Sequence, residues 1–286
     1  MRHRSASAPG LVAAAAALCL LATACAAGGG RPDDPSGAPS GAPSAAPAVT
    51  PPPTGVRFDY QLRAPYPPPP GVQVVARDHS APPAPGVYNI CYVNAFQAQP
   101  GAERDWDADL LLRDGAGKVV MDADWGEAVL DTRTADKRTR IARKVNRWID
   151  DCAAKGYRAV DPDNYDSYTR VPAGLLTADG AKALLALLAE HAHAKGLAIG
   201  QKNTPQLAGD RRRVGADFAV VEECGQYEEC AAYVAAFGDR VIVVEYTAQG
   251  MRRACAGWGG RLSVVRRDLQ LVPKGEPGYH YEVCPE

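Results

Sequence analysis

Short apolar runs recur along the chain, and most of them end in polar residues. Runs of Val, Ile and Leu without alternation are typical of strands buried on both faces. The eight runs that we expect to form strands are residues 58–62, 72–76, 87–94, 157–160, 197–200, 217–221, 241–244 and 262–265. The last five are each followed at once by charged or amide side chains. Polar groups at strand ends are typical of the active face of an α/β barrel.

Two long helices are expected between these strands. Residues 136–152 place Ile141 and Val145 on one face, with Arg and Lys on the other. A second helix is predicted from a Thr177 cap to about residue 195. Helices between strands favour parallel neighbours, so we predict a (β/α)8 TIM-type barrel that forms a single domain. An open doubly wound sheet is the alternative, but no Gly-rich phosphate loop follows any of the strands.

The N-terminus carries the features of an export signal. Basic residues at positions 2–4 precede an apolar run over 11–21 that is too short to span a bilayer. Small residues then lead into Cys25, which resembles the lipobox of bacterial lipoproteins. We therefore predict a signal peptide over residues 1–25, with Cys25 lipidated and the protein held on the outer face of the cell membrane. Plain secretion, with cleavage near Ala26, is the alternative.

Composition separates a tether from a folded domain. Residues 26–54 are Gly, Pro, Ser and Ala with almost no large apolar side chain, which is typical of a disordered spacer. Residues 55–286 are long enough for one barrel with a full core. The formal net charge of −1 gives no electrostatic reason to expect binding to nucleic acid. We expect the domain to act as a monomer.

Six cysteines lie in the predicted domain, and an even number in an exported protein favours disulfides. Fifteen pairings are open to six cysteines, so sequence alone leaves the connectivity unresolved. The pairs that we predict are Cys224 with Cys230, Cys91 with Cys152, and Cys255 with Cys284. Zinc is the alternative use, but no Cys-x-x-Cys pair is present and His is scarce. The sequence therefore predicts neither a metal nor a cofactor.

Three carboxylates follow the fourth expected strand. Asp161 and Asp163 are two residues apart, so an extended backbone points both to one side. Two like charges this close favour a raised pKa for one of them, which suits acid/base chemistry. An aspartate-rich turn is the alternative. A calcium loop fits less well, because Tyr165 occupies an acceptor position and Asp166 the position of the glycine.

Asp163 and Glu222 follow strands that are two apart in the predicted barrel. Two carboxylates across one cleft are the minimum requirement for glycoside hydrolysis. Aromatic side chains on which sugars could stack are Tyr92, Trp125, Tyr168, Tyr227 and Tyr246. A serine nucleophile has little support, since no Gly-x-Ser-x-Gly sequence is present.

Several of these segments together resemble glycoside hydrolase family 114, the endo-α-1,4-polygalactosaminidases. The motifs are residues 161–168, 200–203, 222–230 and 244–246, in this order. The resemblance implies a (β/α)8 barrel that cleaves α-1,4-linked galactosamine polymers internally. It implies Asp163 and Glu222 as the catalytic pair, with Glu223 as the second choice for the glutamate. Asp161 departs from the family, which more often has glutamate there, and this puts a role in positioning substrate in doubt.

A galactosamine polymer with free amines is cationic, so an acidic barrel mouth would attract it. Lys202 is expected to hold one of the carboxylates ionised. The residues expected to contact substrate are Tyr92, Asp161, Asn164, Asp166, Tyr168, Lys202, Asn203, Glu223, Tyr227, Glu245 and Tyr246. Two functions are left open: a retaining glycosidase, with Asp163 as nucleophile and Glu222 as acid/base, or a non-catalytic carbohydrate-binding lipoprotein on the same barrel.

The lipobox leads to a first testable prediction. Replacing Cys25 by Ser removes the thiol that would carry the lipid, so the protein should move from the membrane fraction into soluble or unprocessed material. Fractionation of expressing cells with immunodetection measures the shift. Unchanged partitioning would favour plain secretion instead.

Overall fold

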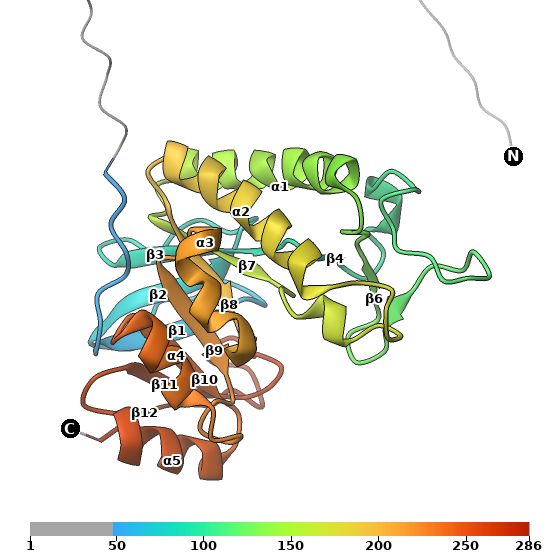
Figure 1. Cartoon of the computed structure of the whole chain (residues 1–286). Coiled ribbons are helices and arrows are strands. Elements are labelled where there is room, and N and C mark those ends of the chain that lie inside the picture. Colours follow the sequence, from blue (N-terminus) through green and yellow to red (C-terminus); the bar gives the residue numbers. More distant parts are fainter. Residues whose placement is uncertain (1–47, 286) are drawn as a thin grey trace, which may run out of the picture. The chain divides into compact units, whose positions relative to one another are not determined.

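The computed structural model describes residues 48–285, so Cys25, the predicted signal peptide and most of the predicted linker lie outside the described part. Eight strands form the barrel wall (Figure 1). In barrel order they are β1 (Arg57–Gln61), β2 (Val72–Asp78), β3 (Tyr88–Asn94), β7 (Ala159–Asp163), β8 (Ala198–Lys202), β9 (Phe218–Glu222), β10 (Val241–Glu245) and β11 (Ser263–Arg267). Every neighbouring pair along this series is parallel, which confirms the predicted TIM-type fold.

The strands continue past their apolar residues. β7 extends to Asp163, because Asp161 and Asp163 are register partners of Tyr92 and Asn94 on β3. β9 likewise extends to Glu222. The charged residues that were expected to follow the strands are therefore held within the sheet, which restricts their backbone more than a loop would.

A buried ion pair joins the first and last barrel strands. Within the described residues, β1 and β11 form no backbone ladder, and β12 (Tyr281–Val283) pairs antiparallel with β11. Arg267 Nη1 lies 2.9 Å from Asp59 Oδ1, and both side chains are fully buried. The Arg267 guanidinium also donates to the backbone carbonyl of Tyr60. Breaking such a pair leaves one charge buried without its counterion, at a cost of about 3–5 kcal/mol.

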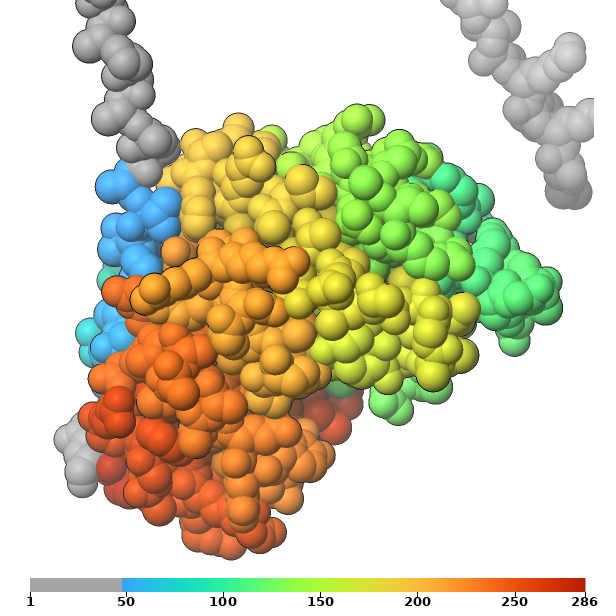
Figure 2. All heavy atoms as spheres, viewed as in Figure 1, coloured from blue at the N-terminus to red at the C-terminus, as the bar shows by residue number. Residues whose placement is uncertain are grey.

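Helices cover the outside of the barrel from the third connection onward, whereas the described connections after β1 and β2 contain none (Figure 1). The helices are α1 (Ala135–Lys155), α2 (Ala178–Ala194), α3 (Arg211–Val214), α4 (Cys230–Phe237) and α5 (Ala248–Trp258), with short 3-10 helices at Glu103–Asp105, Ser167–Thr169 and Pro205–Asp210. Thr134, Thr177 and Thr247 each cap a helix by accepting a backbone N–H. Figure 2, in the same view, shows the green to red part of the chain, which contains these helices, as a continuous outer surface.

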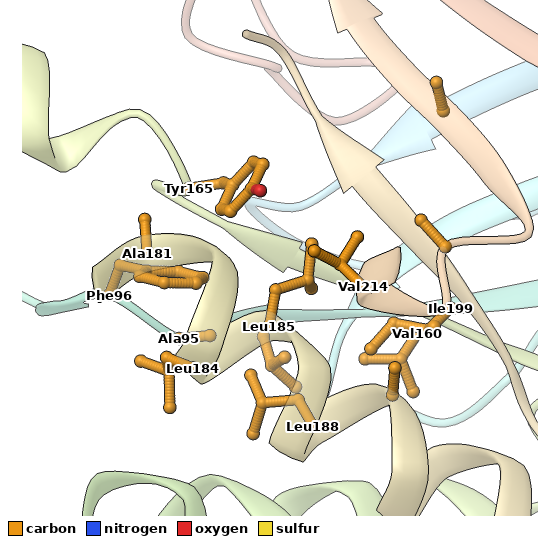
Figure 3. Packing of buried hydrophobic residues seen from close by; sticks show 14 of the residues in the cluster. Ala95, Phe96, Val160, Tyr165, Ala181, Leu184, Leu185, Leu188, Ile199 and Val214 are labelled. Atoms are coloured by element: carbon orange, nitrogen blue, oxygen red, sulfur yellow. The ribbon is translucent and has the colours of Figure 1, made fainter. Parts of the chain in front are cut away.

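The apolar core has two layers. One cluster fills the inside of the barrel and includes Phe218 and Val244. The other lies between strands and helices, where Leu188 of α2 belongs to the same cluster as Val160 and Ile199 (Figure 3). This division follows from the alternation of side chains along each strand, since successive residues point to opposite faces.

A small antiparallel sheet is inserted between β3 and α1. It consists of β4 (Gln97–Ala98), β6 (Glu127–Val129) and β5 (Met121–Asp122), in this order. The surrounding segment is seen at the right of Figure 1, away from α5. The sequence pattern did not predict this sheet, because its strands have only two or three residues each.

The three predicted disulfides are formed, joining Cys91 to Cys152, Cys224 to Cys230 and Cys255 to Cys284. Disulfides persist in oxidising compartments, so they fit an exported protein. Contacts with the barrel begin before residue 55, because the Tyr88 hydroxyl donates to the Thr50 carbonyl at 2.7 Å. Among residues 48–285, no helix has the length and apolar character needed to cross a membrane.

Candidate active site

The inward face of the barrel changes from apolar to polar at the carboxyl ends of the strands. Ala159 on β7 and Phe218 on β9 belong to the interior cluster. Steps of two residues from them reach Asp161, Asp163 and Glu222, because alternate residues share one face. The polar residues that contact one another beyond the apolar cluster are Tyr60, Tyr92, Asp161, Asp163, Lys202, Glu222 and Tyr246.

Lys202 lies between three carboxylates. Its side chain is 1% exposed, and Nζ lies 3.0 Å from Asp163 Oδ1, 3.4 Å from Glu222 Oε2 and 4.0 Å from Asp161 Oδ2. Nζ also donates to the Tyr60 hydroxyl at 2.9 Å. Burial acts to lower the pKa of Lys202, but the three carboxylates raise it well above its ordinary value. The ammonium group therefore stays charged and holds two carboxylates close to each other.

Asp163 is held in its ionised form. Burial alone would raise its pKa, but Lys202 and the Tyr92 hydroxyl bring the pKa below its usual value. Tyr92 donates to Asp163 Oδ2 at 2.6 Å, and the backbone N–H of Asn164 donates to Oδ1 at 2.7 Å. A carboxylate with these donors is fixed in position and available as a nucleophile.

Asp161 has the opposite electrostatic character. Its carboxyl group is fully buried, and burial, with the Asp163 and Glu222 charges adding, raises the pKa to about 7 although Lys202 opposes the shift. The Tyr60 hydroxyl lies 3.5 Å from Oδ2, and Oδ1 has no hydrogen-bond partner. Asp161 and Asp163 thus have pKa values pushed apart, as expected for two carboxylates on one face of a strand.

Glu222 is positioned by the side chains that directly follow the two neighbouring strands, β8 and β10. The Tyr246 hydroxyl donates a short hydrogen bond to Oε1, and Asn203 Nδ2 donates to Oε2 at 3.2 Å. Asn203 Oδ1 in turn accepts the backbone N–H of Glu222 at 2.8 Å. Asn203 therefore fixes both the backbone and the side chain of Glu222, and the glutamate is three-quarters buried with a free path to the cleft.

Left-handed backbone follows three adjacent strands at this end of the barrel. Asn164 follows β7 with φ 65°, Asn203 and Thr204 follow β8 with φ 49° and 62°, and Glu223 follows β9 with φ 59°. This conformation is uncommon for residues other than Gly, although Asn adopts it more readily than most, and it clusters at functional sites. Each turn redirects the chain immediately beyond an inward-facing polar residue.

An open groove crosses these strand ends. One arm has a volume of about 280 Å³ and is lined by Tyr92, Asp163 and Glu222 among others. A second arm of about 370 Å³ is lined by Asp166, Asn203 and Tyr227 among others. The residues shared by both arms are Trp125, Arg170, Glu222, Tyr246 and Leu269. Glu222 therefore lies where the two arms meet.

Most of the predicted contact residues line this groove. Those found there are Tyr92, Asn164, Asp166, Asn203, Glu223, Tyr227 and Tyr246. Asp166 is less available than expected for a cation, because Arg170 Nη2 lies 2.8 Å from its Oδ2. Lys202 and Asp161 lie beneath the groove floor and act through the residues above them. Tyr168 lies outside both linings, and its hydroxyl accepts from Gln206 Nε2 at 2.8 Å.

Glu245 does not face the groove, which corrects its predicted role as a substrate contact. It is fully buried, and Oε1 accepts the backbone N–H of Gly225 at 2.6 Å. Burial raises the pKa of Glu245 to about 7. A Cβ on Gly250 would lie only 2.0 Å from Glu245 Oε2, so a larger residue there would displace this carboxylate. Glu245 therefore supports the loop after β9 from behind.

Two groove residues from the inserted sheet had no signal in the sequence strong enough to select them for the site. Trp125 is 49% exposed and lines both arms, and the sequence distinguishes it only as one of several aromatic side chains. Glu127 lines the first arm, and burial together with the Asp163 charge raises its pKa to about 6 against the effect of two amide donors. Within the described residues, no group of three or more His, Cys, Asp and Glu side chains is arranged to hold a metal ion.

A barrel that carries two carboxylates at an open groove beyond its strand ends has the layout of a barrel glycosidase. The family model of glycoside-hydrolase family GH114 matches residues 39–286. The chain therefore belongs to this family, and membership makes it a glycoside hydrolase.

Solved structures share the fold. The crystal structure of Aspergillus fumigatus Ega3 in complex with galactosamine has a TM-score of 0.68 and 23% sequence identity, covering 83% of this chain and 98% of that chain. The glycoside hydrolase domain of PelA from Pseudomonas aeruginosa has a TM-score of 0.55 and 16% identity, covering 77% of this chain and 97% of that one. At these identities the similarity shows a common fold. A search of curated proteins found no match to this chain.

The position of Lys202 predicts how activity depends on pH. Replacing Lys202 by Met removes the cation that lowers the pKa of Asp163, so this pKa should rise and the acid limb of the kcat/KM profile should move to higher pH. The profile on a soluble oligosaccharide substrate, with the melting temperature as a folding control, measures the shift. An acid limb at the wild-type position would show that Lys202 does not set the ionisation of Asp163.

Proposed function

We propose that the protein is an endo-acting, retaining glycosidase that cleaves α-1,4-linked galactosamine polymers, with Asp163 as nucleophile and Glu222 as acid/base. The observation that carries this proposal is the contact of both carboxylates with the single Nζ of Lys202 at the floor of an open groove. Family membership supplies the reaction class. The galactosamine bound to Ega3 supports the choice of sugar.

The proposed reaction gives the two groups different roles. Asp163, held ionised by Lys202 and Tyr92, attacks the anomeric carbon, while Glu222 donates a proton to the leaving glycosidic oxygen. A glycosyl ester on Asp163 forms and the bond to the leaving sugar breaks. Glu222 then takes a proton from water, which attacks the same carbon and releases Asp163.

The separation of the two carboxylates supports retention. Asp163 Oδ1 and Glu222 Oε2 each lie within ion-pair distance of one nitrogen, at 3.0 Å and 3.4 Å. The two oxygens therefore lie no farther apart than these two distances placed end to end. That upper limit is just below the roughly 6.5–9.5 Å that inverting enzymes need to admit a water. Retaining enzymes have carboxyl groups about 5–5.5 Å apart.

The shape of the groove supports internal cleavage. Its two arms extend to both sides of Glu222 and share their lining at Trp125 and Tyr246. A polymer can therefore lie across the reacting groups with sugars on either side. Exposed aromatic side chains at Trp125 and Tyr227 offer apolar faces for sugar rings.

A non-catalytic carbohydrate-binding role is the second candidate, on the same groove. Membership of a glycoside hydrolase family favours catalysis over binding alone. A lipid on Cys25 remains our proposal for anchoring, and that residue lies outside the described part of the chain.

Substitution of either proposed catalytic residue tests the function. Asp163→Asn and Glu222→Gln keep the size of each side chain and should each lower turnover by about two or more orders of magnitude. A reducing-end assay on a partly deacetylated galactosamine polymer measures this, with Glu223→Gln as the neighbouring control. Full activity in both variants at unchanged melting temperature would exclude the pair, whereas loss in the control alone would transfer the second role to Glu223.

Proton NMR tests the stereochemistry. Two displacements at the same carbon restore the original configuration, so the first reducing end released from the α-linked polymer should be the α anomer. Spectra recorded before mutarotation equilibrates the anomers measure this. An initial β anomer would instead indicate direct attack by water.

A further inference from the structure

Glu127 presents a free carboxylate oxygen to the groove. It lies on β6 of the inserted sheet and lines the arm that contains Asp163. Its Oε2 accepts two hydrogen bonds, from Asn94 Nδ2 at 2.9 Å and from Asn164 Nδ2 at 3.0 Å. With one oxygen fixed by two amides, the side chain has a set orientation, and its other oxygen is left to a ligand.

Glu127 also lacks a counterion among the residues that the structure describes. Asp163 and Glu222 share Lys202, and Asp122 and Asp166 share Arg170. No Lys, Arg or His lies within ion-pair distance of Glu127 in residues 48–285. The pKa of its carboxyl group is raised to about 6 by burial first and then by Asp163, with Asp122 contributing. A cation bound beside Glu127 would reverse this shift.

Asn164 connects Glu127 directly to the nucleophile. Its backbone N–H donates to Asp163 Oδ1 at 2.7 Å, and its side-chain amide donates to Glu127 Oε2 at 3.0 Å. When Asp163 attacks an anomeric carbon, that carbon lies above Asp163 with its ring substituents around it. In a 2-amino sugar, the nitrogen is separated from the anomeric carbon by only two bonds. A carboxylate that is joined to the nucleophile through the hydrogen bonds of Asn164 is therefore placed to meet this nitrogen.

We propose that Glu127 determines specificity for a free 2-ammonium group on the sugar that reacts with Asp163. This inference rests on the proposed function, because it concerns the substrate of the same site. The ammonium donates to the free oxygen of Glu127 and supplies the counterion that the site lacks. An N-acetyl group offers no charge and adds bulk at the same point, so the acetylated sugar is disfavoured.

The same contact assists the chemistry. Positive charge develops at the anomeric carbon in the oxocarbenium-like transition state, and a 2-ammonium group next to it opposes that charge. A carboxylate beside the ammonium reduces this repulsion and does so most in the transition state, which is where an interaction accelerates the reaction. Glu127 therefore should affect kcat as well as KM for substrates with free amines.

The test compares Glu127→Gln with the wild-type protein on partly N-acetylated α-1,4-galactosamine polymer. The glutamine can still accept from both asparagines, so only the charge is removed. The sugar at each new reducing end is the one that reacted at Asp163, and mass spectrometry of the products identifies it. In the wild-type products this sugar should be galactosamine, and in Glu127→Gln the ratio of galactosamine to N-acetylgalactosamine there should fall about tenfold or more.

Asp78→Asn provides a matched control in the same groove arm. Asp78 lines that arm and hydrogen-bonds Ser80, without a bond to Asn164. Removing the charge of Asp78 should leave the ratio of galactosamine to N-acetylgalactosamine at the new reducing ends unchanged, even if overall rates fall for all substrates. An equal fall in both variants would overturn the role of Glu127, because the ratio would then depend on the total negative charge of the groove and not on this residue.

The two proposals fail in different ways. A wild-type protein that releases no reducing ends contradicts the proposed function, whereas cleavage with an unchanged ratio in Glu127→Gln overturns only the specificity role. Melting temperatures establish that the variants are folded. If Glu127→Gln unfolds, Glu127→Asp retains the charge but withdraws it by one methylene, and a smaller fall in the ratio is expected. An unchanged ratio in that variant would also overturn the inference.

Discussion

The arrangement of the active site depends on one buried ammonium group. Three carboxylates on two strands would repel one another inside the barrel, and the charge of Lys202 makes their burial together tolerable. The same ammonium contributes to the difference in pKa between Asp161 and Asp163, since Asp163 contacts it at 3.0 Å and Asp161 only at 4.0 Å. One aspartate is therefore kept ionised while the other has a raised pKa.

The scaffold divides the work between rigid and irregular parts. The proposed reacting groups lie on paired strands, where the register of β7 against β3 fixes the position of Asp163 beside Asn94. The groove walls come from the loops and from the inserted sheet, which contributes Trp125 and Glu127. This separation lets substrate recognition vary without disturbing the catalytic geometry, as is usual for barrels of this kind.

Strand phase explains where the sequence-based site was accurate and where it was not. Asp163, Lys202 and Glu222 are separated by even steps from apolar residues inside the barrel, so alternation alone places them inward. Glu245 is one residue out of that phase on β10 and consequently points outward, beneath the loop after β9. The same count, applied to β10 beforehand, would have removed Glu245 from the expected contacts and kept Tyr246.

The sequence by itself determined the barrel and the strand-end carboxylates, because these depend on local apolar runs and on residue types that recur at each strand. It supplied an even set of six domain cysteines, but the pairing seen in the structure was one of fifteen open to them. Only the tertiary structure decided which groups meet. Glu127 lies 36 residues before Asp163, in a sheet whose strands are only two or three residues long and give no periodic signal. Asn164 connects the two carboxylates through hydrogen bonds. Contacts between segments so far apart are set by how the insertion packs on the barrel, and no local pattern encodes that packing.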